Sequence, residues 1–177
     1  MNILRNLIFV YITSNLIKID KNLSFNDLNF RKIDFTNYKQ IKLFIFKKNF
    51  YKQNLKSVQN FEFLNFSKNL GGKIGINLSK LSILQWHKIN KKKLNHPWSE
   101  DLASKRLINI LYNYEFINSS STLEETKSLN KVIYYHMYKI LLNFKYKIDN
   151  EITSYDLIAY TLSLFVLKKY ESDKINY

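Results

Sequence analysis

Residues 122–144 read TLEETKSLNKVIYYHMYKILLNF, and this stretch predicts an amphipathic helix with a defined start. Thr122 and Glu125 have capping-box spacing, in which the threonine hydroxyl accepts the third amide and the glutamate reaches back to the first. Side chains at helical spacing then share one mainly apolar face: Leu129, Val132, Ile133, His136, Ile140, Leu141 and Phe144. We predict a helix over about residues 123–147.

Two similar segments lie on either side of this helix. Ser99 is a plausible N-cap, and the positions after it that recur at spacings of three and four predict a helix over about residues 100–117. Those positions are Ala103, Leu107, Ile110, Leu111, Tyr114 and Ile117. Thr153 to Asp156 resembles a second capping box and predicts a helix over about residues 154–169. The body of that helix, Leu157 to Leu167, is apolar almost all round, which predicts the most buried element, with a frayed polar end after Lys168.

The chain before Trp98 is less regular. Residues 3–18 have a rough apolar stripe and favour a docked first helix over a targeting segment, because no small-residue cleavage site follows. Residues 41–46 are typical of a strand or of an extended segment lying on helices, and residues 61–66 alternate as extended chain does. Gly71, Gly72 and Gly75 indicate turns. The predicted fold class is therefore mainly α.

The predicted division of the chain follows this change of pattern. Residues 1–98 form a basic, irregular and partly extended N-terminal half, and residues 99–177 form a region of three helices. The two together make one incomplete domain. No apolar run approaches the roughly 20 residues that a transmembrane helix needs, so we predict no transmembrane segment.

The net charge of +14 suggests a polyanionic partner, but composition weakens that inference. Residues 1–98 carry 18 basic and 4 acidic side chains, whereas residues 99–177 carry 10 of each. Of the 28 basic residues only three are arginine, which leaves 28 − 3 = 25 lysines. An AT-rich genome gives this composition whatever the protein does, because lysine codons are AT-rich. The run Lys91 to Lys93 is therefore interpreted as a solvated face.

The cysteine, histidine and glycine content of the chain does not match the spacing of a catalytic, metal-binding or phosphate-binding motif. There is no cysteine, which excludes disulfides and thiolate sites. The three histidines, His87, His96 and His136, lack metal-ligand spacing and are interpreted as core or capping residues. The segment from Gly71 to Gly75 lacks the spacing of a phosphate-binding P-loop. We predict no catalytic residue, no metal site and no cofactor.

Arg106 is the exception, because it is the only arginine after Arg31 in a chain that otherwise uses lysine. It lies next to the apolar face of its predicted helix. Arginine offers a planar, bidentate fork that lysine cannot supply. Two interpretations stay open: a structural ion pair, which is favoured, and an anion contact lining a cleft.

Two stretches resemble the N-terminal region of heparinase II/III-like proteins. The first is Phe61-Glu62-Phe63-Leu64-Asn65, and the second runs from Trp98 through Ser99, Ala103 and Arg106 to Asn109. The later helices, and the opening residues from Arg5 to Leu16, are similar to helices of the same region. Trp98 and Arg106 match motif positions, for which the resemblance implies a structural or cleft-forming role.

The resemblance implies an α/α toroid followed by a β-sandwich, and β-elimination of acidic polysaccharides. The catalytic positions of that family correspond to chain beyond Tyr177, so none transfers to this sequence. The spacing from Phe63 to Trp98 is short by a helix or two, a second tryptophan is replaced at Asn109 or Ile110, and no β-sandwich segment is present. A truncated, split or decaying gene product accounts for these departures.

Three functional hypotheses follow. The first is an N-terminal helical fragment of a heparinase II/III-like polysaccharide lyase, inactive alone, whose partner is an acidic polysaccharide. The second is a basic helical protein that binds RNA or another polyanion, and the third is a structural helper without a ligand. Lysines clustered on one face among aromatic rings favour the second, whereas codon drift scatters them. The compartment stays open between periplasm and cytoplasm.

Overall fold

The structure is a computed structural model that describes residues 56–92, 96–98, 101–146 and 152–175. The predicted helix at residues 3–18, the possible strand at 41–46 and the N-cap at Ser99 lie outside these residues. The described elements are all helical, and none of the described residues forms a strand. They are α3 (Lys56–Gln59), α4 (Phe63–Leu70), α5 (Gly72–Asn90), the 3₁₀ turn η2 (His96–Trp98), α6 (Leu102–Tyr112), α7 (Tyr114–Asn118), α8 (Leu123–Tyr146) and α9 (Ser154–Ile175).

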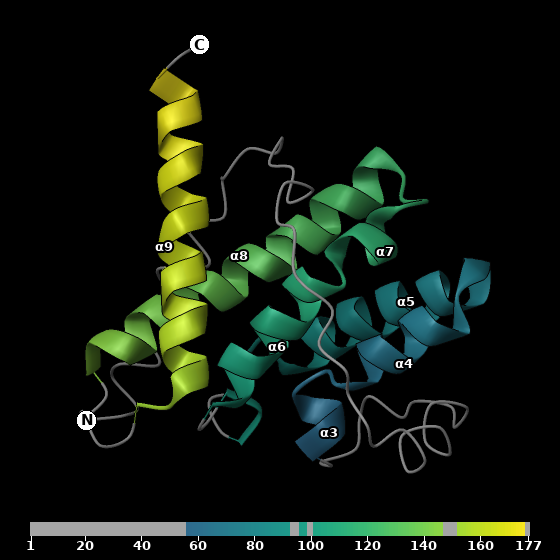
Figure 1. Ribbon diagram of the computed structural model, residues 1–177, viewed down its shortest axis with the longest axis horizontal. Coiled ribbons are helices and arrows are strands. Elements are labelled where there is room, and N and C mark those ends of the chain that lie inside the picture. Colours follow the sequence, from purple (N-terminus) through teal and green to yellow (C-terminus); the bar gives the residue numbers. More distant parts are fainter. Residues whose placement is uncertain (1–55, 93–95, 99–100, 147–151, 176–177) are drawn as a thin grey trace.

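The helices pack as neighbouring pairs around α6. Helices α4 and α5 lie side by side as a hairpin, and α8 runs past both α5 and α6 (Figure 1). Helix α9 crosses α8 steeply and also packs on α6. One apolar core thus joins residues on both sides of Trp98, and its largest fully buried members include Trp86, Phe61, Phe63, Leu107, Ile110, Leu129 and Ile133. None of the described helices is long and apolar enough to cross a membrane.

The predicted helix at 123–147 is confirmed as α8, together with its capping box. The Thr122 hydroxyl accepts the Glu125 amide at 3.2 Å, and the Glu125 carboxylate accepts the Thr122 amide at 2.9 Å. The second box is confirmed too, because Asp156 accepts both the amide and the hydroxyl of Thr153, at 3.1 and 2.9 Å. Side-chain oxygens satisfy first-turn amides that have no partner inside the helix.

The single helix predicted over 100–117 is wrong, because the chain breaks into α6 and α7 at Asn113. The Asn113 side chain donates to the carbonyl of Asn109 at 2.9 Å and to the side-chain oxygen of Asn65 at 3.1 Å. Asparagine competes in this way with the helical backbone pattern. The break turns α7 toward α5, which it contacts.

The extended segment predicted at residues 61–66 is also wrong, since most of it is the start of α4. Phe61 has a φ of 64° and redirects the chain into the helix. Its ring is fully buried and makes edge contacts with Phe63 and Trp86 at 5.5 and 5.3 Å. Burial of these rings overrides the alternating pattern, because sequence periodicity over a short run does not determine backbone conformation. The irregular half predicted for residues 1–98 is therefore helical in its described part from residue 56.

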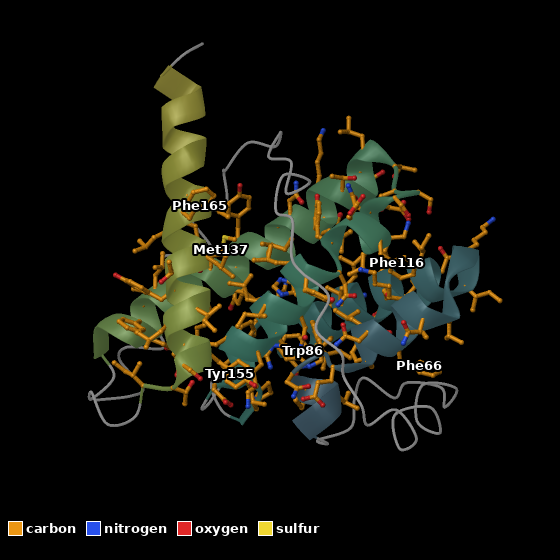
Figure 2. All side chains as sticks on the ribbon, in the orientation of Figure 1. Phe66, Trp86, Phe116, Met137, Tyr155 and Phe165 are labelled. Carbon is orange, nitrogen blue, oxygen red and sulfur yellow. The ribbon has the colours of Figure 1, made fainter. Side chains whose placement is uncertain are left out.

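The turn predicted at Gly71 and Gly72 is confirmed, with φ values of 67° and 53°. The turn predicted at Gly75 is wrong, because Gly75 lies inside α5. The prediction that α9 is the most buried element is wrong as well. Asp156, Ala159, Ser163 and Val166 form its one buried face, and its exposed apolar residues are Leu157, Ile158, Leu164 and Phe165, each 46–59% exposed. Figure 2 shows Phe165 on α9, well away from the core residue Trp86. The helix also continues to Ile175 instead of ending near residue 169.

Candidate functional site

Arg106 and Trp98, the two residues selected from the sequence, meet in the core. The Arg106 guanidinium donates to the backbone carbonyl of Gln59 in α3 at 2.6 Å and to that of Pro97 in η2. Its Nε donates to Nε2 of His136 in α8 at 3.1 Å. We call these groups the Arg106 junction: Arg106 with Gln59, Pro97 and His136. One side chain of α6 thus holds three other elements.

Aromatic rings enclose this cation. The guanidinium carbon lies 4.1 Å from the centroid of the Trp86 ring and 4.9 Å from that of Trp98. The indole nitrogens are themselves bonded, Trp86 to the side chain of Gln59 and Trp98 to the carbonyl of Asn90, each at 2.9 Å. Ring faces stabilise cations, and more strongly where water is excluded.

The junction is structural in its geometry. Arg106 is fully buried and Trp98 is 4% exposed, so neither lines a cleft. Within the described residues no carboxylate contacts Arg106, and its partners are neutral acceptors instead of the ion pair that the sequence favoured. Burial lowers the pKa of Arg106 well below its usual value, because desolvation disfavours the charged form.

The two histidines whose side chains the structure describes, His87 and His136, lie near each other but are not part of a metal-binding cluster among the described residues. His136 belongs to the junction, and its ring centroid lies 6.5 Å from that of His87. The side chain of His96 is outside what the structure describes. Among the described residues no three histidine or acidic side chains are grouped to hold a metal ion.

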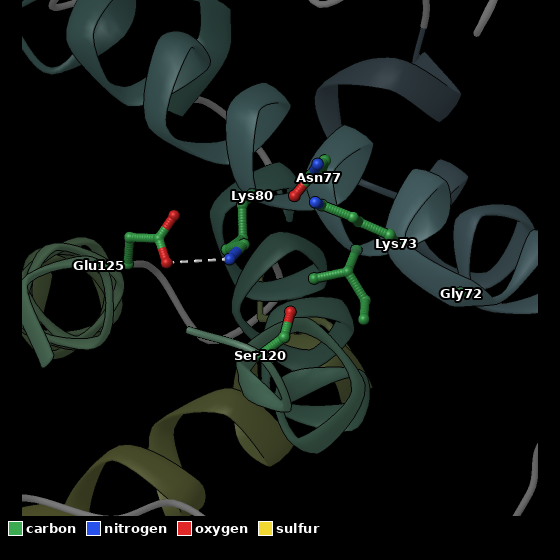
Figure 3. A pocket seen from close by; sticks show the side chains of 7 residues that line it. Gly72, Lys73, Asn77, Lys80, Ser120 and Glu125 are labelled. Carbon is green, nitrogen blue, oxygen red and sulfur yellow. Dashed lines mark hydrogen bonds and ion pairs between the residues drawn. The ribbon is translucent and has the colours of Figure 1, made fainter. Parts of the chain in front are cut away.

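An open hollow of about 540 Å³ lies beside the start of α5. Its lining includes Lys73, Asn77 and Lys80 of α5, with Ser120 and Glu125 opposite (Figure 3). Lys80 is only 5% exposed, and its ammonium group pairs with the Glu125 carboxylate at 3.1 Å. This ion pair neutralises the buried lysine, so the lining of the hollow presents no unpaired buried charge.

A basic surface lies at the other end of α5. We call it the lysine patch: Lys88, Lys91, Lys92 and Lys131, all exposed. Lys88 is on the last turn of α5, Lys91 and Lys92 come directly after that helix, and Lys131 is in α8. The stretch from Phe63 to Ser99 contains seven lysines and no acidic residue, so no carboxylate from this stretch offsets the patch.

His87 and Tyr135 link the two sides of the lysine patch. The Tyr135 hydroxyl of α8 donates to the carbonyl of Lys91 at 2.5 Å, and its ring meets His87 edge-on at 4.9 Å. Burial first, and then the positive charges of Lys91 and Lys131, together lower the pKa of His87 from 6.5 to about 4. Lys91, which follows α5, and Lys131 of α8 therefore both raise the positive potential at His87.

The sequence did not select the lysine patch, because Lys91 to Lys93 read as an ordinary solvated run. Lys131 joins them only through the packing of α5 on α8, which local sequence does not show. The available signal was the acid-free stretch from Phe63 to Ser99. Comparisons with protein-family models, curated proteins and solved structures found no match to this chain.

Proposed function

We propose that this protein is a helical binding protein that holds RNA through the phosphate backbone at the lysine patch. The observation that supports it most is the convergence of exposed lysines from α5 and α8 around His87. Codon drift alone adds lysines without gathering them. Lysine is a compact point charge that suits phosphate contact without base recognition.

Electrostatics favours this surface over the rest of the described chain. The other exposed lysines of the N-terminal helices, Lys68 and Lys73, are at the opposite end of the α4–α5 hairpin. Lys80 and Lys105 are paired with Glu125 and Asp101. The lysine patch gathers four exposed lysines for which no ion pair with another described residue is found, and RNA binding there should release counterions.

A charge-matched pair of variants tests the proposal. Lys91→Gln/Lys131→Gln and Lys68→Gln/Lys73→Gln each remove two positive charges, so nonspecific attraction changes equally. We expect the first variant to bind a labelled single-stranded RNA at least about tenfold more weakly at low salt, with a salt slope smaller by about 1.4. The second should stay close to the parent in fluorescence anisotropy titrations. Equal weakening in both variants would refute a localised site.

A second proposal is that the helices belong to an incomplete α/α toroid of a heparinase II/III-like lyase. The residues that carried the resemblance, Phe61, Trp98 and Arg106, lie together in one core cluster although they are far apart in sequence. The exposed apolar side of α9 also fits a helical domain in which another helix would pack against it. On this proposal Trp98 and Arg106 are core residues of the toroid.

The lyase proposal predicts that the chain alone is inactive. β-Elimination needs a base, an acid and a group that neutralises the carboxylate, all within hydrogen-bond reach of one sugar. The described residues do not converge in that way, so heparan-type and alginate-type polymers should give no unsaturated product by ultraviolet absorbance. Reproducible turnover at high protein concentration would contradict this prediction.

A further inference from the structure

The hydrogen bonds of His136 determine which of its nitrogens carries the proton. Nδ1 lies 2.9 Å from the carbonyl oxygen of Val132, which can only accept, so Nδ1 is the protonated nitrogen. Nε2 then holds the lone pair that accepts the Nε hydrogen of Arg106 at 3.1 Å. His136 is neutral in this arrangement, and both ring nitrogens are used.

No negatively charged group among the described residues faces His136, so a positive charge on its ring would not be neutralised. The charged or titratable groups that face it are Arg106 from α6 and His87 from α5. Helix α3 and η2 present neutral groups at the junction, the carbonyls of Gln59 and Pro97 and the Trp98 ring. The carboxylate of Asp156 in α9 is bonded to Ser104 and Thr153. In the part of the chain that the structure describes, no carboxylate contacts the ring.

Protonation of Nε2 would therefore break the junction. The lone pair that receives the Arg106 hydrogen would be replaced by an N–H, so two donors and two positive charges would face each other at 3.1 Å. Both side chains are fully buried, and water cannot screen them there. Arg106 also holds α3 and η2, so its displacement would release these elements along with α8.

We propose that His136 is an acid-sensitive lock, whose protonation releases Arg106 and opens the junction of α3, η2, α6 and α8. Burial first, and the charge of Arg106 second, lower the pKa of His136 well below its usual value of 6.5 in the folded chain. The unfolded chain consequently binds more protons below about pH 6.5. Stability contributed by the neutral ring is complete above that pH and declines as the pH falls toward the folded pKa.

Tryptophan fluorescence observes this lock directly, because the chain has two tryptophans and both stack on Arg106. Urea unfolding would be followed between about pH 7.5 and about pH 5, above the range in which most carboxylates titrate. Each of His136 and His87 should raise the unfolding equilibrium constant by up to about tenfold per pH unit below about pH 6.5.

His136→Gln supplies a side-chain oxygen that can accept from Arg106 but does not titrate. We expect the unfolding equilibrium constant of this variant to rise less steeply as the pH falls, by up to about tenfold per pH unit less than in the parent, because the contribution of His136 is gone. His87→Gln should lose the contribution of His87 instead and keep that of His136. A pH dependence in His136→Gln that equals the parent's would overturn the proposal.

A second measurement serves if His136→Gln does not fold. The ring proton resonances of His136 in the parent protein can be followed by NMR as the pH falls. We expect the ring to stay neutral in the folded chain and to become protonated only together with the change in tryptophan fluorescence. A reversible titration near pH 6.5 with unchanged fluorescence would exclude the lock.

Discussion

Gly75 lies within α5, where glycine is ordinarily a weak helix former, and contact with α4 explains its presence. A β-carbon at this position would come within 2.2 Å of the backbone carbonyl oxygen of Ser67 and 3.1 Å of the Phe116 ring. The backbone oxygen cannot move away without shifting α4. The absence of a side chain therefore sets how closely the α4–α5 hairpin packs.

Gly75→Ala should reverse the usual sign of a glycine-to-alanine change in a helix. Alanine favours a helix interior by about 1 kcal/mol over glycine, but here overpacking should dominate and cost about 1–3 kcal/mol net. Asn77→Ala, at an exposed position two residues further along α5, is the matched control and should leave stability within about 0.5 kcal/mol. Urea unfolding measures both. A stabilised Gly75→Ala variant would show that the hairpin is less closely packed than described.

The importance of Arg106 could be predicted from the sequence, but its partners could not. Its rarity in a lysine-rich chain identified it, and its position beside an apolar face indicated proximity to the core. Its partners could not be predicted, because Gln59, Pro97 and His136 approach it only after helices that are distant in sequence pack together. The enclosure by two indole rings has the same origin.

Capping boxes begin α8 and α9, and the two differ in burial. The box at Thr122 is exposed and bonds only locally apart from the Lys80 ion pair. In the box at Thr153, Asp156 is 4% exposed and also accepts the Ser104 hydroxyl of α6 at 2.6 Å. The second box therefore anchors α9 on α6 as well as starting the helix.

Asp156→Ala should cost more than the loss of an exposed cap. It removes the carboxylate that accepts the amide and hydroxyl of Thr153 and leaves the buried Ser104 hydroxyl without this acceptor, so we expect a loss of about 2–4 kcal/mol. Thr122→Ala removes one exposed capping bond and should cost about 1 kcal/mol. Thermal or urea unfolding compares the two variants. Similar losses would mean that the contact between Asp156 and Ser104 adds nothing to stability.

At the scale of elements, the sequence predicted helices better than it predicted their surroundings. The capping boxes gave the starts of α8 and α9 because the signal is local. The break at Asn113 and the helical state of residues 63–66 depend on burial against distant segments. Likewise, the composition of α9 could not show that its apolar side from Leu157 to Phe165 would be left partly exposed.

In the whole molecule, the described helices enclose one core around Arg106 and expose a lysine patch at the α5–α8 contact. The mainly α class followed from helical periodicity, whereas the lysine patch needed two helices to be placed together. The sequence predicted no catalytic residue, metal site or cofactor. The proposed function is therefore a property of a surface that tertiary packing creates.

NMR mapping of the RNA-binding surface on the protein is the sharpest test of a site at the lysine patch. A short single-stranded RNA would be titrated into the isotope-labelled protein at low salt, and backbone amide shifts would be followed. We expect the largest changes at Lys88, Lys91, Lys92 and Lys131, with small changes around Lys68 and Lys73. Changes centred on the hollow at the start of α5, on the exposed side of α9, or spread evenly over all lysines would contradict it.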